Sequence, residues 1–238
     1  MEPNEPIAAN DHGSLRAARM PREQRKKLLI RHALHHFASK GFHATSMQDI
    51  ATSAGVTKPV IYQHFSSKRT LYLELLHQVG DDLCCRIRDA TEHCDSVHQR
   101  VYAGYDSYFR FAHESRSGYE LLFVAGPRRD PEFELAIFRV ENEVSELVTS
   151  NIEADISESH RSFLALGVIA LAEGTVRRWL KEVDAAGRAN VDYLETSGPT
   201  WSKRVAELAW AGLRGISRDD SEPKVDGQSQ NAAFSDHF

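Results

Sequence analysis

The chain has 238 residues, of which 41% are hydrophobic, so it can form a sizeable core and is not disordered overall. Its net charge of −5 is unevenly distributed, because residues 14–69 hold eleven Lys and Arg against two acids, a net of +9, and the remainder carries −14. This division predicts that the basic end of the chain binds a polyanion. The acidic remainder should stay soluble and be repelled by that polyanion.

Cysteine usage and hydropathy exclude further classes. Cys84, Cys85 and Cys94 are odd in number and lack CxxC spacing, so neither a disulfide framework nor a zinc site is indicated. The longest apolar run, residues 163–172, is too short to span a bilayer, and no apolar signal segment lies near Met1. We therefore expect a cytoplasmic, soluble protein with no membrane contact, no metal and no cofactor.

The first segment, residues 1–21, lacks periodicity and contains Pro, Asn and Gly, which predicts a flexible arm. Its basic residues Arg16 and Arg19 could reach phosphates or a minor groove, but a solvated tail is the favoured interpretation.

The next segment, residues 22–40, has apolar residues at helical spacing and should end at Gly41. The stripe consists of Leu29, Ile30, Ala33, Phe37 and Ala38. His32 and His36 have the i, i+4 spacing of metal ligands, but no acid or cysteine stands nearby in sequence to complete a site, so packing or partial exposure is favoured.

The segment from Thr45 to Lys68 predicts two short helices at a sharp angle. The first spans Met47 to Ala54 and stops at Gly55, and the second begins after Thr57 and runs to Phe65. Thr45 and Thr57 stand at the expected N-cap positions, and Pro59 stands in the first turn of the second helix. This pattern is typical of a helix-turn-helix. The alternative is two helices at a domain edge with a structural role only.

The two faces of this predicted motif differ in chemistry. The apolar positions expected to lock the helices together are Ile50, Ala51, Ala54, Val56, Ile61 and Phe65. The positions left to point outward are Lys58, Pro59, Val60, Tyr62, Gln63 and His64. A cation, a phenol, an amide and an imidazole suit phosphate oxygens and base edges better than a packed core.

The rest of the chain predicts further helices, so the expected fold class is all-α. The expected segments are residues 68–93, 95–114, 117–125, 131–152, 157–185 and 199–215, with residues 184–199 separating the last two. The tail, residues 217–238, is expected to be disordered.

The segment from residue 28 to residue 76 resembles the amino-terminal DNA-binding domain of the TetR family of bacterial transcription regulators. The residues in register are Phe37, Gly41, Thr45, Ile50, Ala51, Gly55, Val56, Tyr62, Phe65, Lys68 and Leu71. The resemblance implies a three-helix DNA-binding domain over residues 22–67 and a helical effector-binding and dimerisation domain over residues 68–216. It also implies that the helix beginning near Lys68 joins the two and that the last two helices form a four-helix dimer interface.

By this resemblance, a homodimer would place two recognition helices in successive major grooves of a pseudo-palindromic double-stranded DNA operator. Candidates for base edges are Lys58, Gln63 and His64, and Pro59 and Val60 are candidates for thymine methyl groups. Thr45, Tyr62 and Lys68 would meet phosphates, and Thr57 completes the predicted DNA-binding set. Most members of the family repress transcription, so repression is favoured, and activation is the alternative.

The effector is predicted from a narrower similarity, in MPREQRKKLL, SGYELLF and RRWL, to FasR-type actinobacterial regulators, which respond to long-chain acyl-CoA. This similarity implies an apolar tunnel with a cationic mouth. The predicted ligand-binding residues are Tyr105, Phe109, Leu122, Phe123, Phe133, Phe138, Arg128 and Arg177. For the arginines, which include Arg129 and Arg178, a solvated surface is an equal alternative, and a repressor responding to another apolar molecule, such as a drug, would look nearly the same.

Two other classes are disfavoured. An enzyme would need convergent acids or histidines, and the candidate sets are better explained as solvated faces. These sets are Asp81 with Asp82, Glu141 with Glu143, and His32 with His36. A sequence-independent architectural DNA binder would lose affinity equally on operator and scrambled DNA, whereas a regulator keeps a large ratio between them.

Overall fold

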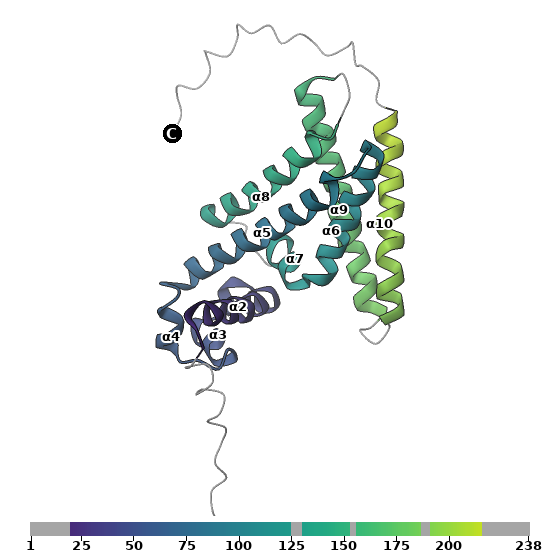
Figure 1. Ribbon diagram of the computed structural model, residues 1–238. Helices are drawn as coiled ribbons and strands as arrows, with labels where there is room; N and C mark the ends of the chain where they lie inside the picture. The colour runs from purple at the N-terminus through teal and green to yellow at the C-terminus, as the bar shows by residue number, and fades with distance from the viewer. Residues whose placement is uncertain (1–19, 125–129, 153–155, 187–190, 216–238) are drawn as a thin grey trace, which may run out of the picture.

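The computed structural model describes residues 20–124, 130–152, 156–186 and 191–215, and these confirm the all-α class. Figure 1 shows the first three labelled helices gathered at one end and the remaining helices forming a helical body above them. The helices are α2 (Arg22–Ala44), α3 (Met47–Ser53), α4 (Lys58–Tyr62), α5 (Lys68–Glu92), α6 (Val97–Glu114), α7 (Arg116–Phe123), α8 (Pro131–Thr149), α9 (Glu158–Ala186) and α10 (Val191–Arg214). The predicted tail and residues 1–19 of the predicted arm lie outside the described residues.

Polar side chains fix where several helices begin. Ser46, Ser67, Ser96 and Asp130 each accept a hydrogen bond from a backbone N–H in the first turn of the helix that follows. At α3 the bond is reciprocal, since the Asp49 carboxylate accepts from the Ser46 amide at 3.1 Å. The N-cap of α3 is therefore Ser46 and not Thr45, whereas Thr57 does precede α4 but makes no side-chain cap bond.

The amino-terminal unit, α2–α4, is built on the predicted apolar positions. Leu29, Ala33 and Phe37 of α2 are fully buried, and they share one core with Ile50 and Ile61. Two glycines supply conformations that other residues rarely adopt. Gly41 has a φ of 78° and interrupts the end of α2, and Gly55 has a φ of 67° and turns the chain between α3 and α4.

The body is organised around α5, which leaves the amino-terminal unit and packs against α6 and α8 along its length. Helix α6 packs in turn against α10, and α9 packs against both α8 and α10. Helix α7 also contacts α2, so the amino-terminal unit touches the body beyond the covalent link through α5. Among the described helices, none combines the length and the apolar character needed to cross a membrane.

The start of α10 differs from the prediction. The sequence was expected to remain a linker until residue 199, but α10 begins at Val191 and contains Pro199. Tertiary packing explains this, because the indole N–H of Trp179 on α9 donates to the Ser197 hydroxyl at 2.9 Å. A Cβ atom on Gly198 would lie 3.1 Å from the Trp179 ring, so this glycine permits close approach and is not a helix terminator.

Candidate nucleic-acid interface and ligand cavity

Helix α4 presents most of its predicted outward residues to solvent. Lys58, Pro59 and Gln63 are exposed and Tyr62 is 44% exposed, whereas Ile61 is fully buried and fixes the helix to the core. Val60 and His64, also predicted to point outward, are half-buried. The arrangement leaves one short helix with cationic, phenolic and amide groups available to a partner that fits against it.

His64 lies in a basic environment. Burial is the largest cause that lowers the pKa of its imidazole, and nearby Arg22, Arg25 and Lys26 lower the pKa further. The lowered pKa favours the neutral ring at pH 7, which offers one nitrogen as donor and the other as acceptor. A neutral imidazole can hydrogen-bond a base edge, whereas an imidazolium would act mainly as a charge.

Two of the predicted phosphate contacts are turned inward. The Lys68 ammonium donates to the carbonyl oxygens of Phe42 at 2.8 Å and Thr45 at 2.9 Å, and it lies 4.5 Å from the centroid of the Phe42 ring. Thr45 is 1% exposed, and its hydroxyl donates to the carbonyl oxygens of Gly41 and His36. Both side chains thus satisfy polar groups at the end of α2 and are engaged within the protein.

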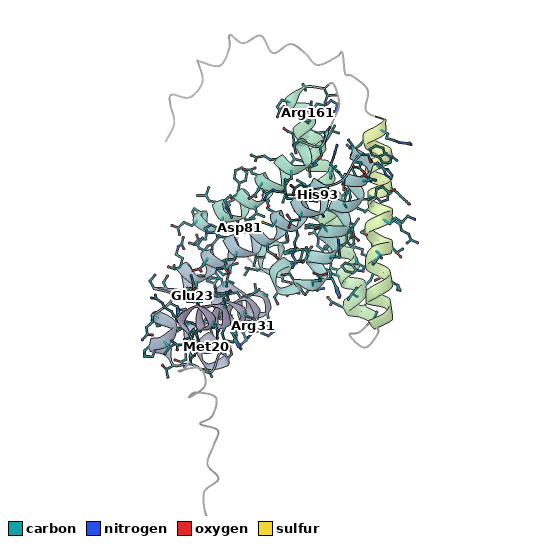
Figure 2. The ribbon with its side chains drawn as sticks, in the orientation of Figure 1. Met20, Glu23, Arg31, Asp81, His93 and Arg161 are labelled. Atoms are coloured by element: carbon teal, nitrogen blue, oxygen red, sulfur yellow. The ribbon has the colours of Figure 1, made fainter. Side chains whose placement is uncertain are left out.

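None of the exposed cations on α2 was predicted from the sequence to contact DNA. Arg22, Lys27, Arg31 and Lys40 are exposed, and they form no ion pair with any part of the chain that the structure describes. Figure 2 shows Arg31 and Glu23 in the amino-terminal unit, at the far end of the molecule from His93 and Arg161. The net charge of +9 over residues 14–69 was the signal that pointed to these side chains.

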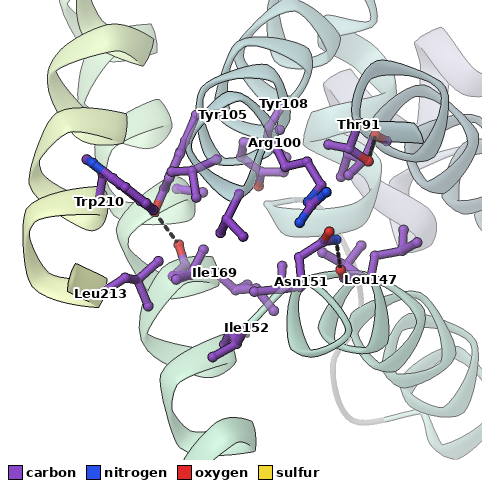
Figure 3. Close-up of a pocket in the computed structure, with 18 of the residues that line it drawn as sticks. Thr91, Arg100, Tyr105, Tyr108, Leu147, Asn151, Ile152, Ile169, Trp210 and Leu213 are labelled. Atoms are coloured by element: carbon purple, nitrogen blue, oxygen red, sulfur yellow. Dashed lines mark hydrogen bonds between the residues drawn. The ribbon is translucent and has the colours of Figure 1, made fainter. Parts of the chain in front are cut away.

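A cavity of about 460 Å³ lies in the body (Figure 3), and no described residue of α2–α4 lines it. Its wall comes from the last turns of α5, α8 and α10, the first turns of α6 and the middle of α9, and is mainly apolar. The lining residues include Ile87, Val101, Gly104, Tyr105, Val144, Leu147, Val148, Ile152, Val168, Ile169, Ala172, Trp210 and Leu213. This volume and lining are typical of a small-molecule site.

Several polar groups in the wall are satisfied by the protein. The Tyr105 hydroxyl donates to the Val168 carbonyl at 3.0 Å, the Thr91 hydroxyl to Ile87, and the Asn151 amide to Leu147 (Figure 3). The Tyr108 hydroxyl, which also lines the cavity, is buried without a hydrogen-bond partner among the described residues. Two cations also line the cavity, Arg100 and Arg214, and the Arg214 guanidinium lies 5.9 Å from the centroid of the Trp210 ring.

Of the predicted ligand-binding residues, Tyr105 lines this cavity and the others that the structure describes do not. Phe109 packs against Trp179, Phe123 against Tyr119, and Phe133 against Tyr72. Leu122 is buried in the core, Phe138 is 56% exposed, and Arg177 is exposed. Arg178 pairs with Glu182, and Arg128 and Arg129 lie outside the described residues. Aromatic content alone could not separate core from cavity wall, because both faces have the same helical period.

Comparison with known proteins shows what the chain is similar to. Residues 29–75 match the family described as bacterial regulatory proteins, tetR family. The chain is 34% identical over 170 residues to the HTH-type transcriptional activator FasR of Mycolicibacterium smegmatis, a match that covers 71% of this chain and 78% of the relative. It is 30% identical over 129 residues to the uncharacterized HTH-type transcriptional regulator YdgC of Bacillus subtilis, covering 50% and 64% of the two chains.

Solved structures show the same fold. The fatty acid degradation regulator FadR from Bacillus halodurans superposes with a TM-score of 0.66 at 17% identity, covering 82% of this chain and 98% of that one. A TetR-like transcriptional regulator from Rhodococcus sp. RHA1 superposes with a TM-score of 0.65 at 22% identity, covering 83% and 100%.

Proposed function

The chain belongs to the tetR family of bacterial regulatory proteins, and from this premise we propose that it controls fatty-acid or lipid biosynthesis genes in response to a long-chain acyl-CoA. Its relatives are regulators, so it is a DNA-binding transcription regulator and not an enzyme. We assign DNA binding to residues 22–67 and effector binding and dimerisation to residues 68–216.

The proposed DNA contact is made by α4 in the major groove. Gln63, Lys58 and the neutral His64 face base edges, Pro59 and Val60 approach thymine methyl groups, and Tyr62 and Thr57 contact phosphates. The exposed cations of α2 add sequence-independent affinity. Thr45 and Lys68 are left out of this set because their side-chain donors are used inside the protein.

The proposed homodimer uses α9 and α10. Phe163, Leu166 and Leu208 are 70%, 61% and 61% exposed, although they are large apolar residues. Gly167 and Gly174 of α9 have open space where a Cβ atom would be, so a second helix can approach closely. Exposed apolar side chains beside small residues favour a helix–helix interface between two copies, which would set two α4 helices on one pseudo-palindromic operator.

The apolar cavity is the observation that carries the proposed effector class. A space of about 460 Å³ can hold an acyl chain but is too small to hold a nucleotide in addition, so the CoA portion would lie outside the cavity. Arg214 and Trp210 are the groups that we assign to that portion, because an exposed guanidinium binds phosphate and an indole stacks on an adenine ring. The similarity to a protein named an activator favours activation over the repression that most of the family performs.

Fluorescence anisotropy of the protein on a fatty-acid synthase promoter fragment and on a scrambled fragment tests this proposal. We expect specific binding that palmitoyl-CoA changes and free CoA does not. Arg214→Gln should weaken palmitoyl-CoA binding about tenfold, and Arg204→Gln, an exposed residue of the same helix that does not line the cavity, should leave it unchanged. Specific DNA binding that no acyl-CoA alters would contradict the lipid assignment and favour another apolar effector. A promoter–reporter assay measures whether the protein activates or represses transcription.

A further inference from the structure

Helix α8 touches both the cavity and the amino-terminal unit. Phe133, Val140 and Leu147 are spaced seven residues apart, which is close to two helical turns, so they share one face of the helix. Leu147 lines the cavity, Val140 is buried against α5, and Phe133 is buried at the opposite end. One rigid element therefore connects two places that are about 21 Å apart along its axis.

At its first turn, next to the amino-terminal unit, α8 is held to the start of α5 by charge. The Arg69 guanidinium, in the first turn of α5, donates to both carboxylate oxygens of Asp130 and, through Nε, to Glu132 at 2.6 Å. The same guanidinium lies 4.9 Å from the centroid of the Phe133 ring. A bidentate hydrogen bond to one carboxylate, together with a bond to a second carboxylate, fixes the orientation of the start of α8 relative to α5 as well as its distance. We call Arg69, Asp130 and Glu132 the clamp.

The ring beneath the clamp reaches the end of α2. Phe133 is 1% exposed, and its ring centroid lies 5.0 Å from that of Phe42 and 4.7 Å from that of Tyr72. Phe42 follows the Gly41 kink, and its carbonyl is the one bound by Lys68. A shift of Phe133 would therefore displace Phe42 at the end of α2, next to α3 and α4 of the proposed DNA-binding unit.

In the middle of α8, Val140 packs directly against Gly80 of α5. A Cβ atom on Gly80 would lie 2.2 Å from Val140 Cγ2, so the glycine makes room for the valine side chain. Two ion pairs also join the helices in this region, Arg139 with Asp81 and Arg88 with Glu143. Seven residues, or about 10 Å, separate Val140 from Phe133 and from Leu147, so the two ends of this face are equally distant from the contact with Gly80.

We propose that α8 is a lever, pivoting where Val140 meets Gly80, that transmits occupancy of the cavity to the DNA-binding unit through the clamp. The identity of the natural ligand rests on the function proposed above, whereas the lever itself requires only that the cavity can be filled. A ligand that binds better when the cavity end of α8 is displaced shifts the position of α2–α4 by that difference in affinity.

The test compares operator affinity with and without palmitoyl-CoA in three proteins. In the wild type we expect a change of about tenfold. Asp130→Asn with Glu132→Gln removes the clamp charges while Asn keeps the N-cap, so this variant should bind palmitoyl-CoA as the wild type does but respond less than about twofold. Arg139→Gln, which breaks an α5–α8 ion pair at the pivot, should respond like the wild type. A clamp variant that responds fully would overturn the proposal.

A second arm needs no ligand. Val148→Trp places a large side chain in the cavity at the same end of α8, with folding checked by circular dichroism. We expect it to alter operator affinity in the wild-type background but not in the clamp variant. If Val148→Trp changes neither background, or both equally, the lever fails even where palmitoyl-CoA binds. If this arm succeeds while palmitoyl-CoA has no effect on the wild type, the ligand assignment fails and the lever stands.

Discussion

The Lys68 ammonium lies 2.9 Å from the carbonyl oxygen of Thr45, so two residues expected to contact the same partner instead contact each other. The bond closes the end of α2 onto the first turn of α5, across 23 residues of chain. It also stands directly beside the Phe42 ring, where the body meets the amino-terminal unit.

Replacing Lys68 by Met should therefore act on stability. The carbonyls of Phe42 and Thr45 would lose a charged donor, at a cost of about 1–3 kcal/mol in the free energy of unfolding. The dependence of operator affinity on salt should stay the same, because no phosphate contact is removed. Lys27→Met, which removes one of the exposed α2 cations proposed to add sequence-independent affinity, is the matched comparison, and it should flatten the slope of log affinity against log salt by about one unit while leaving urea unfolding unchanged. A flattened slope in the Lys68 variant would return that residue to the DNA interface.

The amino-terminal unit should lose stability in mild acid. Burial is the main cause that lowers the pKa of His32, His36 and His64, and neighbouring cations lower it further. A folded-state pKa below the unfolded value of about 6.5 gives stability that is complete above that pH and is lost as pH falls below it. Urea midpoints at pH 7.5 and 5.5 measure the effect.

His36→Gln should reduce that pH dependence. The buried Nδ1 atom of His36 has no hydrogen-bond partner among the described residues, so protonating this imidazole destabilises the folded state. His93→Gln, an exposed histidine at the far end of α5, should not reduce the pH dependence. Equal pH dependence in wild type and His36→Gln would assign the acid sensitivity to other groups.

The local signals in the sequence were sufficient for the helix-turn-helix. Gly55, Pro59 and the apolar spacing of Ile50 and Ile61 are determined by neighbours within a few residues, and the structure has them where the pattern placed them. The side-chain roles of Thr45 and Lys68 depend instead on carbonyl groups many residues away in sequence. Such partners leave no periodic signal in a single chain.

The ligand cavity was beyond the reach of periodicity. Phe133 and Tyr105 are both aromatic residues on the buried face of a helix, yet one packs against the amino-terminal unit and the other lines the cavity. The difference comes from how five helices pack, and small residues such as Gly104 help to leave the space open.

Filling the cavity at Gly104 should block the ligand. The nearest atom to a Cβ built on Gly104 is Thr91 Cγ2, at 3.8 Å, so the backbone accepts a side chain without strain. Gly104→Leu should weaken palmitoyl-CoA binding by about tenfold or more, because the leucine occupies space within the cavity. Gly104→Ala adds the Cβ atom alone and should bind within about threefold of the wild type. Isothermal titration calorimetry measures both, and equal binding by the Leu variant would move the ligand elsewhere.

Charge placed on the exposed apolar face of α9 and α10 should separate the proposed dimer. Leu166→Glu with Leu208→Glu adds carboxylates that a helix interface would have to bury unpaired. Light scattering after size exclusion should show a monomer, and operator affinity should fall because two linked α4 helices are no longer presented. Leu135→Glu, on the exposed face of α8, is the control and should remain a dimer. A dimeric double variant would place the interface on another surface.

The early start of α10 depends on one buried hydrogen bond. Ser197→Ala would leave the indole N–H of Trp179 buried without its acceptor, since Trp179 is 1% exposed, at a cost of about 1–3 kcal/mol in the free energy of unfolding. Ser202→Ala is the matched control, because among the described residues that buried hydroxyl bonds only the Pro199 carbonyl, within the same helix, and it should cost less than about 1 kcal/mol. Urea denaturation followed by tryptophan fluorescence measures both. If Ser197→Ala is as stable as the wild type, the first turns of α10 are held by packing against the Trp179 ring, and Gly198→Ala, which forces a Cβ toward that ring, becomes the change that destabilises them.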